Sequence, residues 1–325
     1  MAESDQRRYP VTGFILVGFP GLQDVESGLG SLLLVVYILI IVGNVSVLYM
    51  VTTDKRLHMP MYFLLANLAA VDLVLTTAVI PRILARLILH HKFILWSNCF
   101  VQMYFFHSMS AAKILLLSIM AYDRSAAICN PLYYLSLTRD AIFGKMAGLA
   151  WVTGMVCFLP PIMLASIFPF CGANEVYNSF CELLSVTSLI CTDASIVQFV
   201  ILVLNVMLVV LNFVYIVYSY INIAKSVKGS ALPELRKTLS TCVGHMLLTS
   251  FYFPSVVLYI AIFYFGCIPP IISVAFAVLY VTLTPLLSTI IYILSAKQMR
   301  QKIVQLIRRK KISPPFGSTV AVESH

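Results

Sequence analysis

Charged side chains are scarce in this sequence: 11% of its 325 residues are Asp, Glu, Lys or Arg, whereas 60% are hydrophobic. The mean hydropathy is correspondingly high, at +0.94. A water-soluble domain needs far more charge to cover its surface, so this scarcity excludes a soluble globular protein. It also leaves no basic soluble domain that could contact nucleic acid. The composition therefore predicts an integral membrane protein.

The sequence also lacks the residue patterns of common catalytic and metal sites. It has no Ser-His-Asp set, no His/Cys cluster with metal-ligand spacing and no Gly-rich phosphate loop at a plausible membrane depth. We therefore expect neither enzymatic activity nor a cofactor or metal. Its only N-x-[ST] sequence begins at Asn44, inside a long apolar run, so the N-terminal segment carries no glycan acceptor.

Long apolar runs, in contrast, are abundant. A helix needs roughly 20 mostly apolar residues to cross a bilayer. Seven windows satisfy this requirement, near 29–52, 60–80, 99–123, 142–166, 196–224, 238–263 and 270–294. Strands of a membrane barrel would instead alternate over about ten residues. The sequence predicts an all-α membrane protein whose seven-helix domain spans 29–294 and follows an extracellular tail over 1–28.

Lysines and arginines are distributed unevenly about these spans. Most of the 22 lie in the loops on one side or after the last span. Because cytoplasmic loops carry an excess of Lys and Arg, this bias predicts an extracellular N-terminus and a cytoplasmic C-terminus. Residues 295–311 place apolar side chains at near-helical spacing among cations, which predicts a short amphipathic helix on the inner leaflet. Residues 312–325 are expected to form a disordered cytoplasmic tail.

The eight cysteines fall into two groups. Those expected to be free thiols in or near the spans are Cys129, Cys157, Cys242 and Cys267. Those on the outer side are Cys99, Cys171, Cys181 and Cys191. The outside of a cell is oxidising, so these four can form two disulfides in any of three pairings, among which spacing does not choose. A zinc site is the alternative, although it would want closer spacing and nearby histidines.

Five motifs in chain order carry a resemblance to a known family. They are HMPMYFLLANLAAVDL (58–73), MAYDRSAAICNPLYY (120–134), SYINI (219–223), RKTLSTCVGHM (236–246) and TPLLSTIIYILSAKQMR (284–300). Over nearly the whole chain they closely resemble the olfactory (odorant) receptors, a family of rhodopsin-like G-protein-coupled receptors. Two further stretches, GFPGLQD (18–24) and AICNPL, resemble the fish, or first-class, branch of that family.

The resemblance implies a multi-pass receptor of the cell membrane. Such a receptor binds a small, mostly apolar odorant in the outer half of the bundle. It also activates a heterotrimeric G protein of the stimulatory type, which raises cyclic AMP. The resemblance further implies the disulfides Cys99–Cys181 and Cys171–Cys191.

There are three alternatives to an odorant receptor. The first is a receptor of the same fold for a non-odour ligand outside sensory tissue, and the second is a diverged member that signals weakly. The third is a channel or transporter, which would show repeat symmetry or a polar path, and the sequence shows neither.

The implied ligand pocket lies between the third, fifth, sixth and seventh helices. Its facing positions are Met103, His107, Ser110, Ala111, Asn205, Tyr252, Ser255 and Tyr259. A mostly apolar wall with a few hydroxyls suits a small volatile ligand. Each position could instead be a helix-packing contact, and His107 could be a structural histidine. Phe106 replaces the aspartate of amine receptors. Phe263 replaces an arginine common in first-class receptors, so an acidic ligand is not favoured.

Four residues match the family's coupling switch: Asp123, Arg124, Tyr220 and Tyr292. The resemblance implies that Arg124 pairs with Asp123 at rest and contacts a G protein when the sixth helix moves outward. An ordinary interfacial ion pair is the alternative. The chain departs from the family at Ser125, which replaces a tyrosine. It departs again where Ser288 and Thr289 replace Asn-Pro, which removes a helix-kinking proline.

Lys113 lies in the middle of an apolar helix, where an isolated charge costs at least about 2.5–3.5 kcal/mol. Asp72 is the only acid in the apolar part of the second span. Each residue lies about twelve positions from the inner end of its helix, roughly 18 Å at 1.5 Å per residue, so the two should pair. In related receptors this aspartate helps to hold sodium, so the resemblance implies that the Lys113 ammonium replaces the ion. Alternatively, Lys113 faces the ligand cavity and binds an acidic odorant, or it loses its proton on burial.

Overall fold

Seven long helices make up most of the protein, as a computed structural model shows. They are α1 (Glu26–Thr53), α2 (Pro60–Ile88), α3 (Trp96–Cys129), α5 (Ile142–Ile167), α7 (Ser195–Ser226), α8 (Leu232–Phe265) and α9 (Pro270–Ser295). Each contains a window long and apolar enough to cross a membrane, which confirms the predicted seven-helix fold. The structure describes residues 12–19, 21, 23–139, 141–170, 174–228, 232–265, 269–295 and 301. Apart from Ser295 and Gln301, the predicted amphipathic helix and tail lie outside these residues.

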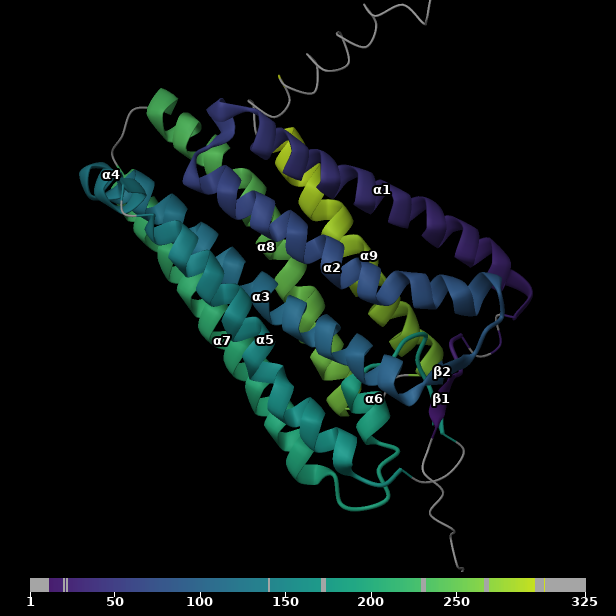
Figure 1. Ribbon diagram of the computed structural model, residues 1–325. Coiled ribbons are helices and arrows are strands. Elements are labelled where there is room, and N and C mark those ends of the chain that lie inside the picture. Colours follow the sequence, from purple (N-terminus) through teal and green to yellow (C-terminus); the bar gives the residue numbers. More distant parts are fainter. Residues whose placement is uncertain are drawn as a thin grey trace, which may run out of the picture.

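The short elements lie at the two ends of the bundle. They are the strands β1 (Gly13–Leu16), β2 (Phe93–Leu95) and β3 (Glu175–Val176), the helices α4 (Pro131–Arg139) and α6 (Leu183–Thr187), and the 3-10 turns Gln23–Val25 and Lys55–Leu57. β1, β2 and α6 gather at one end and α4 lies at the other (Figure 1). Sequence patterns had not predicted the strands, because each has at most four residues and takes its partners from distant parts of the chain.

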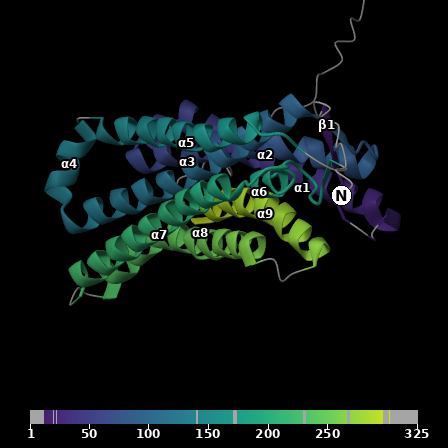
Figure 2. The same ribbon diagram turned by 90° about the horizontal axis from the view of Figure 1, so that it is seen from below.

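α3 is the central helix of the bundle. It packs against α2, α5, α7 and α8, whereas α1 packs against α2 and α9. In its most apolar window 72% of α3 is buried, compared with 17% of α7. Figure 2 shows α7 and α8 along one side, with α5 above and α9 beside them. Polar side chains are therefore best shielded from lipid when they lie on α3.

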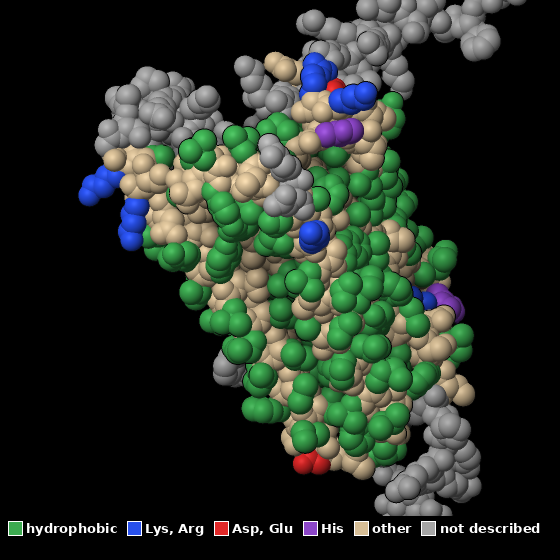
Figure 3. All heavy atoms as spheres, turned by 60° about the vertical axis from the view of Figure 1, so that its left-hand side comes forward, with side chains coloured by type: hydrophobic (Ala, Val, Ile, Leu, Met, Phe, Trp, Pro, Cys, Tyr) green, Lys and Arg blue, Asp and Glu red, His purple; other side chains and the backbone are tan. Residues whose placement is uncertain are grey.

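The outer surface of the bundle is apolar. Hydrophobic side chains cover most of the face shown in Figure 3, and the Lys and Arg side chains in that view lie mostly toward its upper end. Exposed apolar side chains are numerous on α7, for example Phe199, Leu211 and Tyr218. In water such a surface would be unstable, whereas in a bilayer it contacts hydrocarbon at no cost.

A small sheet and a buried ion pair close one end of the bundle, which is called the outer end because the bias of Lys and Arg predicts that it is extracellular. β1 pairs antiparallel with β2 and parallel with β3. Arg86 of α2 contacts Glu26 at 2.8 Å and donates hydrogen bonds to the carbonyls of Leu16 and Val17 at 3.2 and 2.8 Å. Both charged side chains are 3% exposed. The segment after β1 is therefore tied to the bundle by an internal charge pair.

α3 and α5 approach closely at a glycine. A Cβ added to Gly154 would lie 2.6 Å from the Ser108 carbonyl oxygen and 2.9 Å from the Ala112 nitrogen, both backbone atoms. Small residues allow this kind of close helix contact in membranes. Gly148 lies on the same helix, yet an added Cβ there would meet nothing within 4 Å.

We expect Gly154→Ala to lower the thermal stability of the purified receptor, because the methyl group would force α3 and α5 apart. Overpacking of this kind costs about 1–3 kcal/mol. Gly148→Ala is the matched control and should melt at the wild-type temperature or slightly above, since Ala is the better helix former. Equal melting temperatures for the two variants would contradict the close packing of α3 and α5.

Candidate functional site

A small internal cavity of about 30 Å³ lies among α3, α5, α7, α8 and α9. It is lined by Phe106, His107, Ser110, Ala111, Ile114, Phe158, Asn205, Leu208, Val256, Tyr259, Ile260 and Tyr280. Most of these side chains are apolar, and the polar ones are three hydroxyls, one amide and one imidazole. Such a wall is chemically suited to a small apolar molecule and offers it a few hydrogen bonds, but the space is about that of one water molecule, so an odorant must displace side chains to enter.

Five of the eight residues predicted for the pocket line this cavity: His107, Ser110, Ala111, Asn205 and Tyr259. The other three do not. Met103 packs in the outer core cluster beside Cys99. The Ser255 hydroxyl donates to the Phe251 carbonyl of its own helix at 2.6 Å, and Tyr252 lies deeper in the bundle.

Phe158 and Tyr280 line the cavity although sequence reasoning had missed both. Phe158 stacks on His107, with ring centroids 5.1 Å apart. It comes from α5, a helix outside the set expected to contribute. Its apolar neighbours in sequence gave no sign of which side of α5 faces inward.

His107 faces a buried acid from the loop that follows α5. Its Nε2 lies 3.9 Å from Glu182 Oε1, too far for a direct hydrogen bond. Glu182 Oε2 accepts hydrogen bonds from the Ser185 nitrogen and hydroxyl at 2.8 and 3.1 Å, which caps α6. Burial raises the pKa of the Glu182 carboxyl, and hydrogen bonds from Ser185 oppose that rise. This acid also interacts with Tyr259, so the loop reaches the residues that line the cavity.

Hydroxyl groups connect the inner side of the cavity to deeper residues. The Tyr252 hydroxyl lies 3.3 Å from that of Tyr280 and 3.4 Å from the Ser110 carbonyl oxygen. The Tyr280 hydroxyl donates to Ser110 Oγ at 3.5 Å. The ring of Tyr252 also packs under the Lys113 ammonium, 5.3 Å from its centroid. Tyr252 therefore contacts both the cavity residues Ser110 and Tyr280 and the buried ammonium of Lys113.

Lys113 and Asp72 form an ion pair inside the bundle. Lys113 Nζ lies 2.6 Å from Asp72 Oδ1, and the two side chains are 1% and 0% exposed. The same ammonium donates to Ser288 Oγ of α9 at 3.5 Å. Lys113 does not line the cavity, so this geometry does not favour contact with a ligand. Ser288, where the family has Asn, is part of this polar cluster.

The inner end of α3 carries a second charged cluster. Arg124 donates to Asp123 Oδ2 from Nε at 3.0 Å and also from an Nη. The hydroxyl of Tyr134, on α4, donates to Asp123 Oδ1 at 2.8 Å. Ser125, the departure from the family pattern, lies 3.9 Å from the Cys129 sulfur. The Asp123 carboxylate thus joins α3 to α4.

Tyr220 is hydrogen-bonded to a histidine that sequence reasoning had missed. Its hydroxyl lies 2.7 Å from His245 Nδ1, and His245 Nε2 lies 3.0 Å from the Leu117 carbonyl oxygen. A carbonyl only accepts, so Nε2 carries the hydrogen and the Tyr220 hydroxyl donates to Nδ1. The chain links α7, α8 and α3 through one imidazole. The Tyr292 side chain lies outside the described part of the protein.

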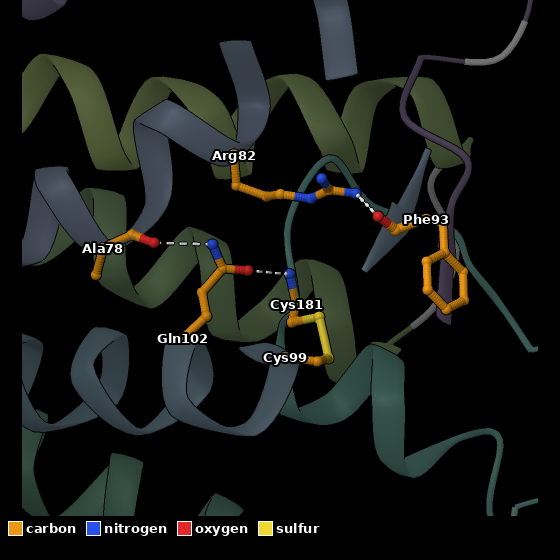
Figure 4. The surroundings of a disulfide bond; sticks show 6 residues. All are labelled: Ala78, Arg82, Phe93, Cys99, Gln102 and Cys181. Atoms are coloured by element: carbon orange, nitrogen blue, oxygen red, sulfur yellow. Dashed lines mark hydrogen bonds between the residues drawn. A yellow bond between two sulfur atoms is a disulfide. The ribbon is translucent and has the colours of Figure 1, made fainter. Parts of the chain in front are cut away.

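A disulfide joins Cys99, at the start of α3, to Cys181 in the outer loop (Figure 4). Gln102 lies beside it: its amide nitrogen donates to the Ala78 carbonyl at 2.8 Å, and its oxygen accepts from the Cys181 nitrogen at 2.9 Å. Cys191 is also disulfide-bonded, whereas Cys171, its predicted partner, lies outside the described residues. Cys129 and Cys157 are free thiols, as expected.

Comparison with known proteins agrees with this architecture. The profile of the family described as "Olfactory receptor" matches residues 33–310. The chain is 36% identical to human "Olfactory receptor 6K3" over 309 residues, which covers 93% of this chain and 91% of that one. It is 33% identical to mouse "Olfactory receptor 1M1" over 312 residues, or 94% and 97% of the two chains.

Among solved structures, squid rhodopsin superposes with a TM-score of 0.69 and 17% identity, covering 91% of this chain and 89% of that one. This likeness concerns the fold. Assignment to the fish or first-class branch stays a prediction. From the family profile and its relatives, the chain belongs to the olfactory receptor family and is a membrane-embedded, G-protein-coupled odorant receptor rather than an enzyme.

Proposed function

We propose that this receptor binds a small, mostly apolar odorant in the cavity lined by His107, Ser110, Ala111, Asn205 and Tyr259. The supporting observation is the cavity itself, which lies among five helices and is lined mainly by apolar side chains; its volume is about 30 Å³, so the lining side chains move apart when an odorant enters. An odorant gains affinity there by burying apolar surface, and the few polar groups select its orientation. The N-terminus lies outside and the C-terminus inside, as the bias of Lys and Arg indicates.

The odorant-bound receptor activates a stimulatory G protein, which raises cyclic AMP. An odorant that presses on Tyr280 or Ser110 also displaces Tyr252, since these three groups lie within 3.5 Å of one another. Tyr252 belongs to α8, the helix whose inner part holds His245 against Tyr220 and Leu117. Outward movement of α8 breaks this contact and frees Arg124 from Asp123 to meet the G protein. Tyr292 completes the switch by its resemblance to the family.

Lys113 serves as a built-in counter-ion for Asp72. The contact of 2.6 Å between two fully buried side chains supports this role, and Ser288 offers the ammonium a further acceptor. The lysine then occupies the place where relatives hold sodium, and the pair is neutral without any ion from solution. A charge left alone at this depth would be costly.

Expression in cells together with a cyclic AMP reporter and an odorant panel tests this function. We expect at least one small apolar odorant to raise cyclic AMP. Ala111→Leu should shift its half-maximal concentration by about tenfold or more, because the larger side chain fills the cavity and a lost 1.4 kcal/mol is a tenfold change. Ser255→Ala is the control and should respond like wild type, since this hydroxyl bonds within its own helix.

An N-terminal epitope on intact cells measures surface expression and reports orientation. If the epitope is accessible only after permeabilisation, the proposed topology is wrong. If both variants respond normally to every active odorant, the ligand binds elsewhere.

The ion pair is tested by a double-mutant cycle. Lys113→Met and Asp72→Asn each leave one buried group unpaired, which typically costs about 3–5 kcal/mol, so each variant should lose surface expression and melt earlier. The double variant should recover part of the loss, because neither charge remains. Losses that simply add would show that the two residues are uncoupled. Signalling by the wild-type receptor should be the same in sodium and potassium buffers, and a sodium dependence would contradict the counter-ion role.

A further inference from the structure

A groove opens between the outer parts of α2 and α3, and none of its lining residues belongs to the odorant cavity. Its volume is about 500 Å³. Pro81 and Ala85 form one wall, and Val101 and Phe105 form the other. Val101 is 55% exposed and Phe105 36% exposed on the outside of the bundle. The groove is therefore open on the outside of the bundle.

The groove also contains a cation without an acidic partner, Arg82. Its guanidinium uses two of the five donor hydrogens of an arginine, neither of them on an acidic group. One nitrogen lies 3.0 Å from His91 Nδ1. Another donates to the Phe93 carbonyl oxygen at 2.6 Å, as Figure 4 shows. Nε is buried and has no hydrogen-bond partner. Arg82 makes no ion pair with any residue that the structure describes.

The next turn of α2 shows the contrast. Arg86 is neutralised by Glu26 at 2.8 Å, whereas Arg82 has no such partner among the residues that the structure describes. Lys92 adds an exposed cation in the loop that follows. Arg82 lies six residues before the end of α2, roughly 9 Å below it at 1.5 Å per residue. Its guanidinium reaches past that end to His91 and Phe93, so the positive charge lies near the surface of the outer leaflet, where it attracts the headgroup of an anion.

We propose that this groove binds a long-chain carboxylic acid from the outer leaflet, with its carboxylate on Arg82 and its chain along Val101 and Phe105. A carboxylate forms short, charge-assisted hydrogen bonds with a guanidinium, and the apolar wall takes the chain. A phosphatidylcholine headgroup is a poorer match, because its own ammonium would meet Lys92 and Arg86. The class of ligand is thus a single-chain anionic amphiphile.

The back wall of the groove is connected to the odorant cavity through the loop that contains Cys181 and Glu182. Gln102 lines the groove and bonds both to Ala78 of α2 and to the nitrogen of Cys181. The next residue in the loop is Glu182, which faces His107 in the cavity. A bound acid that holds α2 and α3 in place also holds this loop. The site therefore modulates the response to odorant without overlapping the odorant.

Photolabelling tests the site in the full-length receptor. The receptor is placed in phosphatidylcholine nanodiscs and exposed to a diazirine-bearing stearic acid, and the labelled peptides are mapped by mass spectrometry. We expect labels to concentrate on residues 78–85 and 93–105, and unlabelled stearic acid to remove them. Methyl stearate, which has the chain without the charge, should compete at least roughly tenfold less well, the loss expected for a charge-assisted bond.

Variants distinguish the contribution of the Arg82 charge to binding from that of the shape of the groove. Arg82→Gln should reduce labelling roughly tenfold, and Arg82→Lys should keep most of it. Ala85→Phe should block labelling by filling the groove while leaving the cation. Arg56→Gln, at the opposite end of the bundle, is the control and should label like wild type. Equal competition by methyl stearate, or labels spread evenly around the lipid-facing helices, overturns the proposal. The competition needs only the wild-type chain, so it decides even if a variant fails to fold.

Discussion

Hydrocarbon offers no partner to a polar group, and this constraint organises the interior of the receptor. Lys113 and Asp72 meet it by neutralising each other at 2.6 Å. The pair involves more than two helices, since the ammonium also reaches Ser288 of α9 and lies over the Tyr252 ring of α8. Four helices therefore share one polar centre. A rotation or shift of any of them changes the surroundings of a buried charge, so the ion pair couples the positions of these helices.

The groups that matter for function lie in sequence along one helix. On α3, His107 and Ser110 line the cavity, Lys113 forms the ion pair, and Arg124 forms the inner charged cluster. At 1.5 Å per residue, Lys113 is roughly 9 Å from His107 and about 16 Å from Arg124 along the axis. α3 is also the helix most enclosed by others. The cavity, the buried ion pair and the Asp123–Arg124 cluster therefore all include residues of the same enclosed helix.

Sequence reasoning succeeded where one physical quantity decided the answer. Hydropathy and length predicted seven spans. Equal depth along two helices predicted a Lys113–Asp72 pair, and these side chains lie in contact. It failed where the position of a residue depended on how a helix is rotated or on partners from distant segments of the chain. Spacing alone did not exclude Met103 or Ser255 from the cavity, because apolar residues surround these helices on every side. Glu182, His245 and the strands depend on partners far away in the chain, which leave no local pattern.

The outer sheet has a consequence for the order in which the receptor is made. β1 is synthesised first, yet its partners are β2 and, as far along as Val176, β3. At about 5–20 residues per second, the N-terminal segment waits roughly ten to thirty seconds for its last partner. Until then only the edge of β1 that faces β2 can pair, and the edge that faces β3 stays open. Completion of the sheet thus requires a chain whose first four spans have already been synthesised.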